Sequence, residues 1–312
     1  MTTGAADHHR ILASVQAWRG APMALATVIE TWRSAPCPVG THMLVHQDGR
    51  FVGSVSGGCV EGDVLQTAAD VIAENSFAVR RYGVADGSAW EVGLPCGGDI
   101  VVLVQNVSPD FFPGKLFGAI IDARAAGQNL LIATDIEKGT SHIVDGDHMG
   151  LFINYYLPLR RLIIVGAVEI ASALSAIACS MGIAVTVIDP RARFLTSERF
   201  PDVVLDDRWP DEAIAALRPD IRTAIVTLSH DPKIDDPALI AALGSPAAYI
   251  AALGSKLSHA KRRERLTAAG VGAVEFDRIE GPAGVSINAI SAPEIALSIA
   301  GGMVRAFNDG LR

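Results

Sequence analysis

Residues 162–188 read LIIVGAVEIASALSAIACSMGIAVTVI, and Glu169 is their only charged side chain. An apolar run of this length can cross a bilayer. Both ends are nevertheless rich in β-branched residues and of strand length, and Gly166 and Gly182 separate them from the central stretch. Strands of a parallel sheet are buried on both faces and have this continuous apolar character. The stretch therefore predicts a strand–helix–strand unit and not a membrane span.

The residues around this unit indicate which fold it belongs to. Strand, glycine turn, helix, strand and acid form the layout of a Rossmann-like dinucleotide-binding unit. Asp189 lies 23 residues after Gly166, close to the spacing of the acid that holds a ribose hydroxyl. However, Val168 stands where a glycine would let the backbone reach a diphosphate, and Glu169 would repel one. Gly166 and Asp189 are thus candidate cofactor-binding residues in a unit from which we expect weak or absent NAD binding.

The alternation of strands and helices separates the chain into two parts. After residue 160 we expect further strands at 202–205, 222–227 and 247–252. Before it, hairpin signals mix with helices, which is typical of an α+β domain. The predicted fold class is α/β, with an N-terminal α+β domain (1–157) and a Rossmann-like C-terminal domain with a parallel sheet (158–312). Local signals predict hairpins at Gln47–Gly49 and Asp145-Gly146, and helix starts at Asp236-Pro237 and at Ser291 with Glu294.

Polar residues follow two of the predicted strands, at the carboxyl edge where open α/β sheets bind ligands. His230 and Asp231 are candidates for ligand contact, and a helix-capping role stays equally open for them. Gly254, Ser255 and Lys256 lie between a strand and a helix, where backbone amides can hold a phosphate. Two other groups are expected to be solvated, namely the strand histidines His42 and His46 and the helical cations Lys261, Arg262, Arg263 and Arg265.

Composition narrows the classes of function. The chain has 312 residues, of which 50% are hydrophobic and 19% charged, as in a globular protein of two domains. Its net charge of −8 argues against nucleic acid as a partner. Four cysteines without a C-x-x-C pair make neither a disulfide framework nor a structural zinc site. No signal peptide or hydrolase, kinase or metalloprotease motif is present, so we expect a cytoplasmic protein without catalytic residues.

Two cysteines lie inside glycine frames, SGGCVEGD (56–63) and GLPCGG (93–98). Glycine permits positive φ and the close approach of another molecule. The first frame runs into a helix expected over 59–74, whose N-terminus favours a thiolate or a bound anion. The cysteines are either small buried hydrophobes in turns or part of a binding site. The candidate cofactor-binding residues are Ser56, Gly57, Gly58, Cys59, Glu61, Cys96, Gly97 and Gly98.

The strands beside these frames suggest how both thiols could share one site. A strand at 50–55 precedes the first frame, and a strand at 99–105 follows the second. If the two strands are antiparallel neighbours, both turns emerge at one edge of the sheet with the thiols within roughly 10 Å. We expect this edge to face the carboxyl edge of the second domain's sheet.

Several stretches of sequence resemble those of the XdhC/CoxI family of xanthine dehydrogenase accessory proteins, which mature molybdenum hydroxylases. The stretches include SVSGGCVEGDV (54–64), EVGLPCGGDI (91–100), VTVIDPRARFLTSERFP (185–201) and VTLSHDPKIDDPAL (226–239). The resemblance implies a chaperone that binds the molybdenum cofactor (molybdopterin), supports its sulfuration and inserts it into a xanthine dehydrogenase-type apo-enzyme. It also implies a cysteine desulfurase as a further partner and a homodimer.

The chain departs from this family at one turn. Relatives usually carry Gly-x-Gly-His-x-Ala where this chain has Val168 and Glu169. The departure concerns nucleotide binding in the second domain and leaves the rest of the resemblance intact. An NAD(P)-dependent oxidoreductase is the alternative that the second domain alone would favour.

Overall fold

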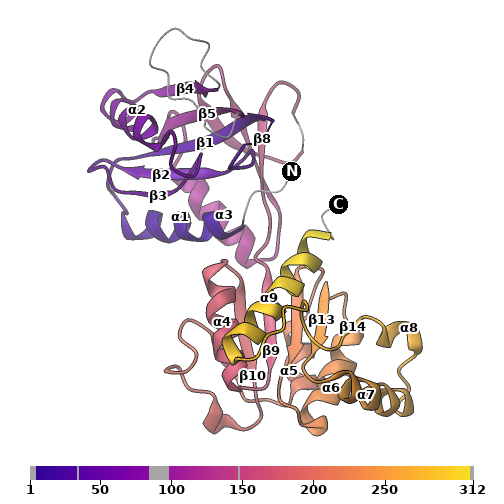
Figure 1. The fold of residues 1–312 in the computed structure, drawn as a ribbon. Helices are drawn as coiled ribbons and strands as arrows, with labels where there is room; N and C mark the ends of the chain where they lie inside the picture. The colour runs from indigo at the N-terminus through magenta and orange to yellow at the C-terminus, as the bar shows by residue number, and fades with distance from the viewer. Residues whose placement is uncertain (1–4, 34, 84–97, 147, 310–312) are drawn as a thin grey trace. The chain divides into compact units, whose positions relative to one another are not determined.

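Three sheets organise the chain: two antiparallel sheets in its first half and one parallel sheet in its second half (Figure 1). The computed structural model describes residues 5–33, 35–83, 98–146 and 148–309. These divide into two compact units, Met1–Pro158 and Leu159–Arg312. The first unit is α+β and the second carries a six-stranded parallel sheet, so the predicted fold class is confirmed.

The first unit is built on an antiparallel five-stranded sheet in the order β3-β2-β1-β5-β4. Its β2 and β3 pair antiparallel across Gln47–Gly49, so the first hairpin prediction is confirmed. The strands are β1 (Met23–Trp32), β2 (His42–His46), β3 (Phe51–Gly53), β4 (Phe77–Tyr82) and β5 (Asp99–Asn106).

Alternation along these strands directs side chains to two separate cores. Ala24 and Ala26 of β1 pack in one cluster with the helix α2 (Glu61–Glu74). Met23 and Leu25 pack on the opposite face with α1 (Ala5–Ala17) and α3 (Lys115–Ala125). The period of two along a strand explains this division.

A second, three-stranded sheet completes the first unit. Its order is β7-β6-β8, formed by β6 (Leu130–Asp135), β7 (Thr140–Val144) and β8 (Phe152–Tyr156). The predicted hairpin at Asp145-Gly146 is therefore wrong, because β6 lies between the strands that this turn would join. A short connection joins β6 to β7, which pair with each other, and β8 pairs with the other edge of β6.

The second unit has a parallel sheet in the order β11-β10-β9-β12-β13-β14. The strand–helix–strand prediction is confirmed, since α4 (Glu169–Ser180) connects β9 to β10. The strand order reverses between β9 and β12, the switch point at which such sheets bind ligands. The strands are β9 (Arg161–Val165), β10 (Ala184–Ile188), β11 (Val204–Asp206), β12 (Thr223–Thr227), β13 (Tyr249–Ala252) and β14 (Ile279–Glu280).

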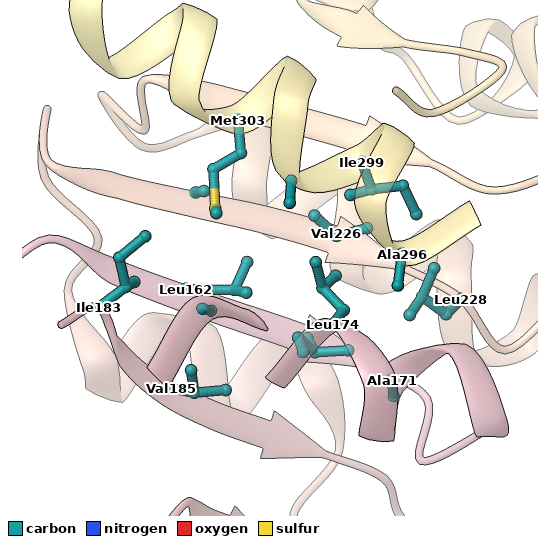
Figure 2. Packing of buried hydrophobic residues seen from close by; sticks show 14 of the residues in the cluster. Leu162, Ala171, Leu174, Ile183, Val185, Val226, Leu228, Ala296, Ile299 and Met303 are labelled. Atoms are coloured by element: carbon teal, nitrogen blue, oxygen red, sulfur yellow. The ribbon is translucent and has the colours of Figure 1, made fainter. Parts of the chain in front are cut away.

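Helices cover both faces of the parallel sheet. Figure 2 shows one face, where Leu162 and Val226 of the sheet pack against Leu174 of α4 and against Ile299 and Met303 of α9. No helix among the described residues is long and apolar enough to cross a membrane. The remaining helices are α5 (Pro210–Leu217), α6 (Pro232–Leu243), α7 (Lys256–Ala268), α8 (Ala273–Phe276) and α9 (Ala292–Asp309), with a 3₁₀ turn at Ala192–Phe194.

One of the two predicted helix starts is confirmed. The Glu294 carboxylate accepts hydrogen bonds from the amides of Ile290 (2.8 Å) and Ser291 (2.9 Å), which is the carboxylate half of a capping box. The start at Asp236-Pro237 is wrong, because α6 already begins at Pro232. Two Asp/Pro pairs compete there, and the earlier one, Asp231-Pro232, provides the N-cap and the first residue of the helix.

Candidate functional site

The loop that carries Cys59 is folded around the carboxylate of Glu61. Oε1 accepts hydrogen bonds from the Ser54 hydroxyl (2.5 Å) and the Ser56 amide (2.9 Å). Oε2 accepts from the Ser56 hydroxyl (2.6 Å) and the Gly58 amide (2.8 Å). Burial alone would raise the pKa of Glu61, but the donors of Ser54 and Ser56 lower it to about 2. This candidate residue is therefore an anion that organises the loop.

Cys59 is positioned by the same network. Its amide donates to the Ser56 hydroxyl (3.0 Å), as does the amide of Val60 (3.0 Å). Val60 is the N-cap of α2, so Cys59 lies just before the helix, as predicted. The amides expected to attract an anion thus have protein partners, while the Cys59 side chain stays half-buried. Gly57 (φ +78°) and Gly58 (φ +118°) adopt the left-handed conformation that glycine tolerates.

Cys37, to which sequence reasoning assigned no role, lies beside this loop. Its Sγ contacts the carbonyl oxygen of Ser54 at 3.7 Å. Cys37 and Cys59 both pack against the core beneath α2. The two prolines that flank Cys37 were an available signal, because they fix a turn between β1 and β2.

The two strands beside the glycine frames are not neighbours, so that prediction is wrong. Two strands, β2 and β1, lie between β3 and β5. Three successive antiparallel pairings still make β3 and β5 antiparallel to each other. The pairings place Gly53, the last residue of β3, level with Val104 of β5, so the start of β5 at Asp99 lies five residues, about 17 Å, further along the strand direction. The order of the strands depends on how their apolar faces pack, and no local motif indicates that order.

The edge of the sheet at which β1 and β4 end and β5 begins is called the cysteine edge below. The start of α2 is tied to it, because the Tyr82 hydroxyl donates to the Asp63 carboxylate (2.7 Å). Burial and this hydrogen bond raise the pKa of Tyr82 above its usual value. Gly98 is buried beside the first residue of β5. The candidate residues Cys96 and Gly97 lie outside the described residues.

A cavity of about 440 Å³ opens at the cysteine edge. Its lining includes Trp32, Tyr82, Gly83 and Asp99. Trp32 is 62% exposed and presents an aromatic surface there. No described residue of the Cys59 loop lines this cavity, and the hydrogen bond from Tyr82 to Asp63 connects the cavity to the start of α2. The described residues hold no group of three or more metal-ligating side chains.

In the second unit, Asp189 is fully buried and its carboxylate has four partners. It accepts hydrogen bonds from the Ala167 amide (2.8 Å), the Arg191 amide (2.9 Å), and Nε (2.9 Å) and Nη2 (2.8 Å) of Arg191. Burial would raise the pKa of Asp189, but the donors of Arg191 and Ala167 lower it. A carboxylate engaged in this way joins β10 to the turn after β9 and offers no acceptor for a ribose hydroxyl.

Gly166 occupies the switch point with a φ of +103°. A Cβ at this position would lie 2.7 Å from the Ser229 amide nitrogen, so the turns after β9 and β12 approach each other closely. This explains why glycine is needed here without any ligand. His230, which follows Ser229 in the sequence, is exposed and has a φ of +62°. This strained backbone conformation is common at functional sites.

The remaining candidates at the carboxyl edge cap helices. Asp231 accepts a hydrogen bond from the Lys233 amide (2.9 Å) as the N-cap of α6. Ser255 accepts from the Ser258 amide (3.1 Å) as the N-cap of α7. Gly254 has a φ of +137°, and Lys256 is exposed at the first position of α7. Capping thus occupies the side chains of Asp231 and Ser255, whichever further role they have.

Sequence reasoning missed two buried charges at this edge. Asp235 accepts a hydrogen bond from Ser229 (2.7 Å), and burial raises its pKa. Arg262, expected to be solvated, is 4% exposed and donates to the Leu253 carbonyl (2.9 Å). The available signal was the spacing of Arg262 four residues before Leu266, which puts both on the buried face of α7.

The strand histidines are also buried, which corrects the expectation that they are solvated. His42 contacts the hydroxyls of Thr27 (2.9 Å) and Tyr156 (2.8 Å) through its two ring nitrogens. His46 accepts a hydrogen bond from the Asp48 amide (3.2 Å). Both histidines lie on the sheet face that α1 and α3 cover. The sequence pattern of a strand does not show whether one or both faces of its sheet are packed, so their burial was not predicted.

Comparisons with known proteins agree with these two units. A family model described as "XdhC and CoxI family" matches residues 17–83, which include Cys37 and Cys59. A second model, described as "XdhC Rossmann domain", matches residues 162–303. A solved structure described as a xanthine dehydrogenase from Bacillus halodurans has a TM-score of 0.84 at 24% identity, covering 97% of this chain and 96% of that chain. This likeness confirms the fold.

Two curated relatives align along most of the chain. The molybdenum cofactor insertion chaperone PaoD of Escherichia coli is 30% identical over 94% of this chain and 86% of its own length. A probable subunit of the xanthine dehydrogenase of Bacillus subtilis is 26% identical over 88% of this chain and 90% of its own length. The resemblance seen in the sequence is confirmed: the chain belongs to the XdhC/CoxI family.

Proposed function

We propose that this chain is a chaperone that binds the molybdenum cofactor, supports its sulfuration and inserts it into a xanthine dehydrogenase-type hydroxylase. The observation that carries the proposal is the preformed Cys59 loop within the segment that matches the XdhC and CoxI family. The similarity to a molybdenum cofactor insertion chaperone along 94% of the chain supports it.

The chemistry of the cysteine edge fits such a cargo. Molybdenum bound by a dithiolene is a soft centre, and a cysteine thiolate is a soft ligand. Gly57 and Gly58 have no side chains to obstruct the approach of a ligand to Cys59. The exposed Trp32 provides an aromatic surface of the kind on which a flat pterin ring stacks. In this proposal Cys59 contacts the metal or its sulfur, and Trp32 positions the ring.

Rigidity of the loop is part of the proposed function. A binding group held by supporting hydrogen bonds loses little entropy when its ligand arrives. The Glu61 carboxylate accepts from both serine hydroxyls and fixes the backbone on either side of Cys59. The side chain of Cys59 is thereby presented in one place both for loading and for transfer to the client. Glu61 acts as a positioning residue.

The second unit does not support the alternative of an NAD(P)-dependent oxidoreductase. The Asp189 carboxylate is buried and saturated by Ala167 and Arg191. Val168 is packed against the core of the unit, so its side chain occupies the turn. We therefore expect no micromolar NAD binding, and none after Val168→Gly, because that change leaves Asp189 engaged. Calorimetry with both proteins tests this, and micromolar binding by either contradicts it.

Cofactor retention tests the main proposal directly. The purified chain is incubated with molybdopterin cofactor, desalted and treated with acidic iodine, which converts retained pterin to a fluorescent product. We expect retention by the unmodified chain and at least about a tenfold loss in Cys59→Ser. Cys179→Ser is the matched control, because Cys179 lies in α4 of the second unit and packs against that core.

Client maturation separates insertion from sulfuration. In cells lacking the chaperone, Cys59→Ser should leave the client hydroxylase inactive although the variant melts like the unmodified chain. A client with molybdenum but without cyanide-releasable sulfur indicates a sulfuration role, and a client without molybdenum indicates insertion. Equal pterin retention in both cysteine variants would contradict the assignment of Cys59.

A cysteine desulfurase as sulfur donor, a cytoplasmic location and a homodimer belong to the same proposal. Co-purification tests the desulfurase, cell fractionation tests the location, and sedimentation tests the homodimer.

A further inference from the structure

A second recess lies in the first unit, at the end of the five-stranded sheet opposite the cysteine edge. It has a volume of about 880 Å³ and is called the distal groove here. Asn75 at the end of α2 and Asn106 at the end of β5 line it. Since α2 spans 14 residues from the Cys59 loop to Asn75, the distal groove lies about 20 Å from that loop.

Most of the groove surface is apolar. Val15 of α1, Met23 of β1, Ile72 of α2, and Phe117 and Ile121 of α3 all contribute to the lining. Binding sites for small molecules have this character, with volumes of about 300–1,000 Å³ and a few polar groups that orient the ligand. The size and lining thus fit a small molecule with an apolar body.

The charges in the groove have one sign. Arg19 and Lys115 line it, and no acidic side chain does. In the part of the chain that the structure describes, neither cation takes part in an ion pair, although the chain as a whole has a net charge of −8. Asn75, by contrast, has protein partners, because it donates to Asp110 (2.9 Å) and accepts from Asn106 (2.7 Å). The groove therefore favours an anion, because its lining has two cations that form no ion pair with any described residue and no acidic side chain.

A glycine in α3 keeps the groove open. Gly118 lies in the interior of the helix and lines the groove, and a Cβ at this position would meet nothing within 4 Å. Glycine inside a helix costs about 1 kcal/mol of stability relative to alanine. No backbone strain or close contact requires glycine here, whereas a larger side chain would extend into the groove.

We propose that the distal groove binds a small amphipathic anion, whose apolar body is the size of one or two rings and which carries one carboxylate, sulfonate or phosphate group. The body packs against Met23, Phe117 and Ile121, and the anionic group pairs with Arg19 and Lys115. This site is separate from the cysteine edge and goes beyond the proposed chaperone function. The acidic group supplies the charge that the lining lacks, and the rings fill the space beside Gly118.

Fluorescence titration of the full-length chain with 8-anilinonaphthalene-1-sulfonate, an apolar ring system with one negative charge, tests the proposal. We expect saturable binding at one site. Gly118→Leu should weaken it by at least about tenfold because leucine fills the space, and Lys115→Glu by about three- to tenfold, less at high salt. The matched controls are Ala69→Leu on the exposed face of α2 and Arg10→Glu on that of α1, which should change binding by less than about twofold.

Displacement of the dye identifies the anionic group. 1-Naphthoate and 1-naphthyl phosphate, which share the same ring system, are added to the dye complex, and the stronger competitor shows whether the site prefers a carboxylate or a phosphate. The proposal is overturned if the unmodified chain binds no dye, if Gly118→Leu binds as well as the unmodified chain, or if Ala69→Leu loses binding equally. Cys59→Ser should bind the dye normally, so failure here is distinguishable from failure of the chaperone proposal.

Discussion

Replacing Glu61 by glutamine removes the charge around which residues 54–60 fold and keeps the size of the side chain. The carboxylate accepts hydrogen bonds from two serine hydroxyls and from the amides of Val55, Ser56, Gly58 and Val60. A glutamine keeps one acceptor oxygen and turns an NH₂ group toward donors that need an acceptor. The loop then contains donors without partners, in a region where Glu61 itself is 8% exposed.

The pKa of Glu61 sets the size of the effect. A carboxyl group whose pKa falls from 4.5 to about 2 on folding is stabilised as the anion by about 3 kcal/mol. This stability is fully present above the unfolded pKa and is lost as the pH falls toward the folded pKa. At pH 3 about 2 kcal/mol of it should be gone. We therefore expect Glu61→Gln to lower the free energy of unfolding by about 2–3 kcal/mol at pH 7 and by much less at pH 3.

Urea denaturation at a series of pH values, followed by circular dichroism, measures this difference. The transition that shifts should be that of the first unit, because the hydrogen bonds of the Glu61 carboxylate are all made with residues 54–60. Glu74→Gln is the control, since Glu74 is exposed at the other end of the same helix. Destabilisation below about 1 kcal/mol at pH 7, or a difference that stays constant down to pH 3, would refute the reasoning.

Three further predictions concern other groups. Asp189→Asn should destabilise the second unit by about 2–4 kcal/mol in urea, because it removes a buried charge with four donors, whereas the exposed Asp207→Asn should stay within about 0.5 kcal/mol. Burial, assisted by Arg124, lowers the pKa of His8 to about 4. His8 therefore binds a proton at a higher pH in the unfolded protein than in the folded protein. The free energy of unfolding should fall as the pH drops from about 6.5 to 4, and His8→Gln should flatten this dependence. Iodoacetamide should label Cys59 before Cys179, whose pKa is raised by burial, and equal slow labelling of both would contradict an accessible Cys59.

Local chemistry explains which predictions the sequence supported. The apolar run at 162–188 specified β9, α4 and β10 because parallel strands buried on both faces need continuous apolar side chains. The glycines at 57, 58 and 166 were recognisable because their backbone conformations exclude most other residues. The capping box at Ser291 and Glu294 was equally local, because both partners lie within one turn of helix.

Interactions between residues that are distant in sequence, or between groups that compete locally, could not be predicted in this way. The strand pattern identified β3 and β5 but not the two strands between them, since strand order depends on how whole faces pack. Asp189 looked like a ribose ligand, and only the fold shows that Ala167 and Arg191 use its carboxylate. Arg262 was assigned to a solvated face because cations on helices are usually solvated, whereas this one donates to a carbonyl at the end of β13.

The sequence by itself determined the fold class, the Cys59 loop and the family. These depend on the periodicity of apolar residues, on backbone conformation and on sequence motifs, all within short segments. Only the tertiary structure decided what the charged groups do. It assigned Glu61 to its own loop and Asp189 to a buried junction, and it placed Arg19 and Lys115 in the distal groove, where no described residue forms an ion pair with them. The physical reason is that the state of a charge depends on its burial and on donors and acceptors that the fold brings together from remote positions.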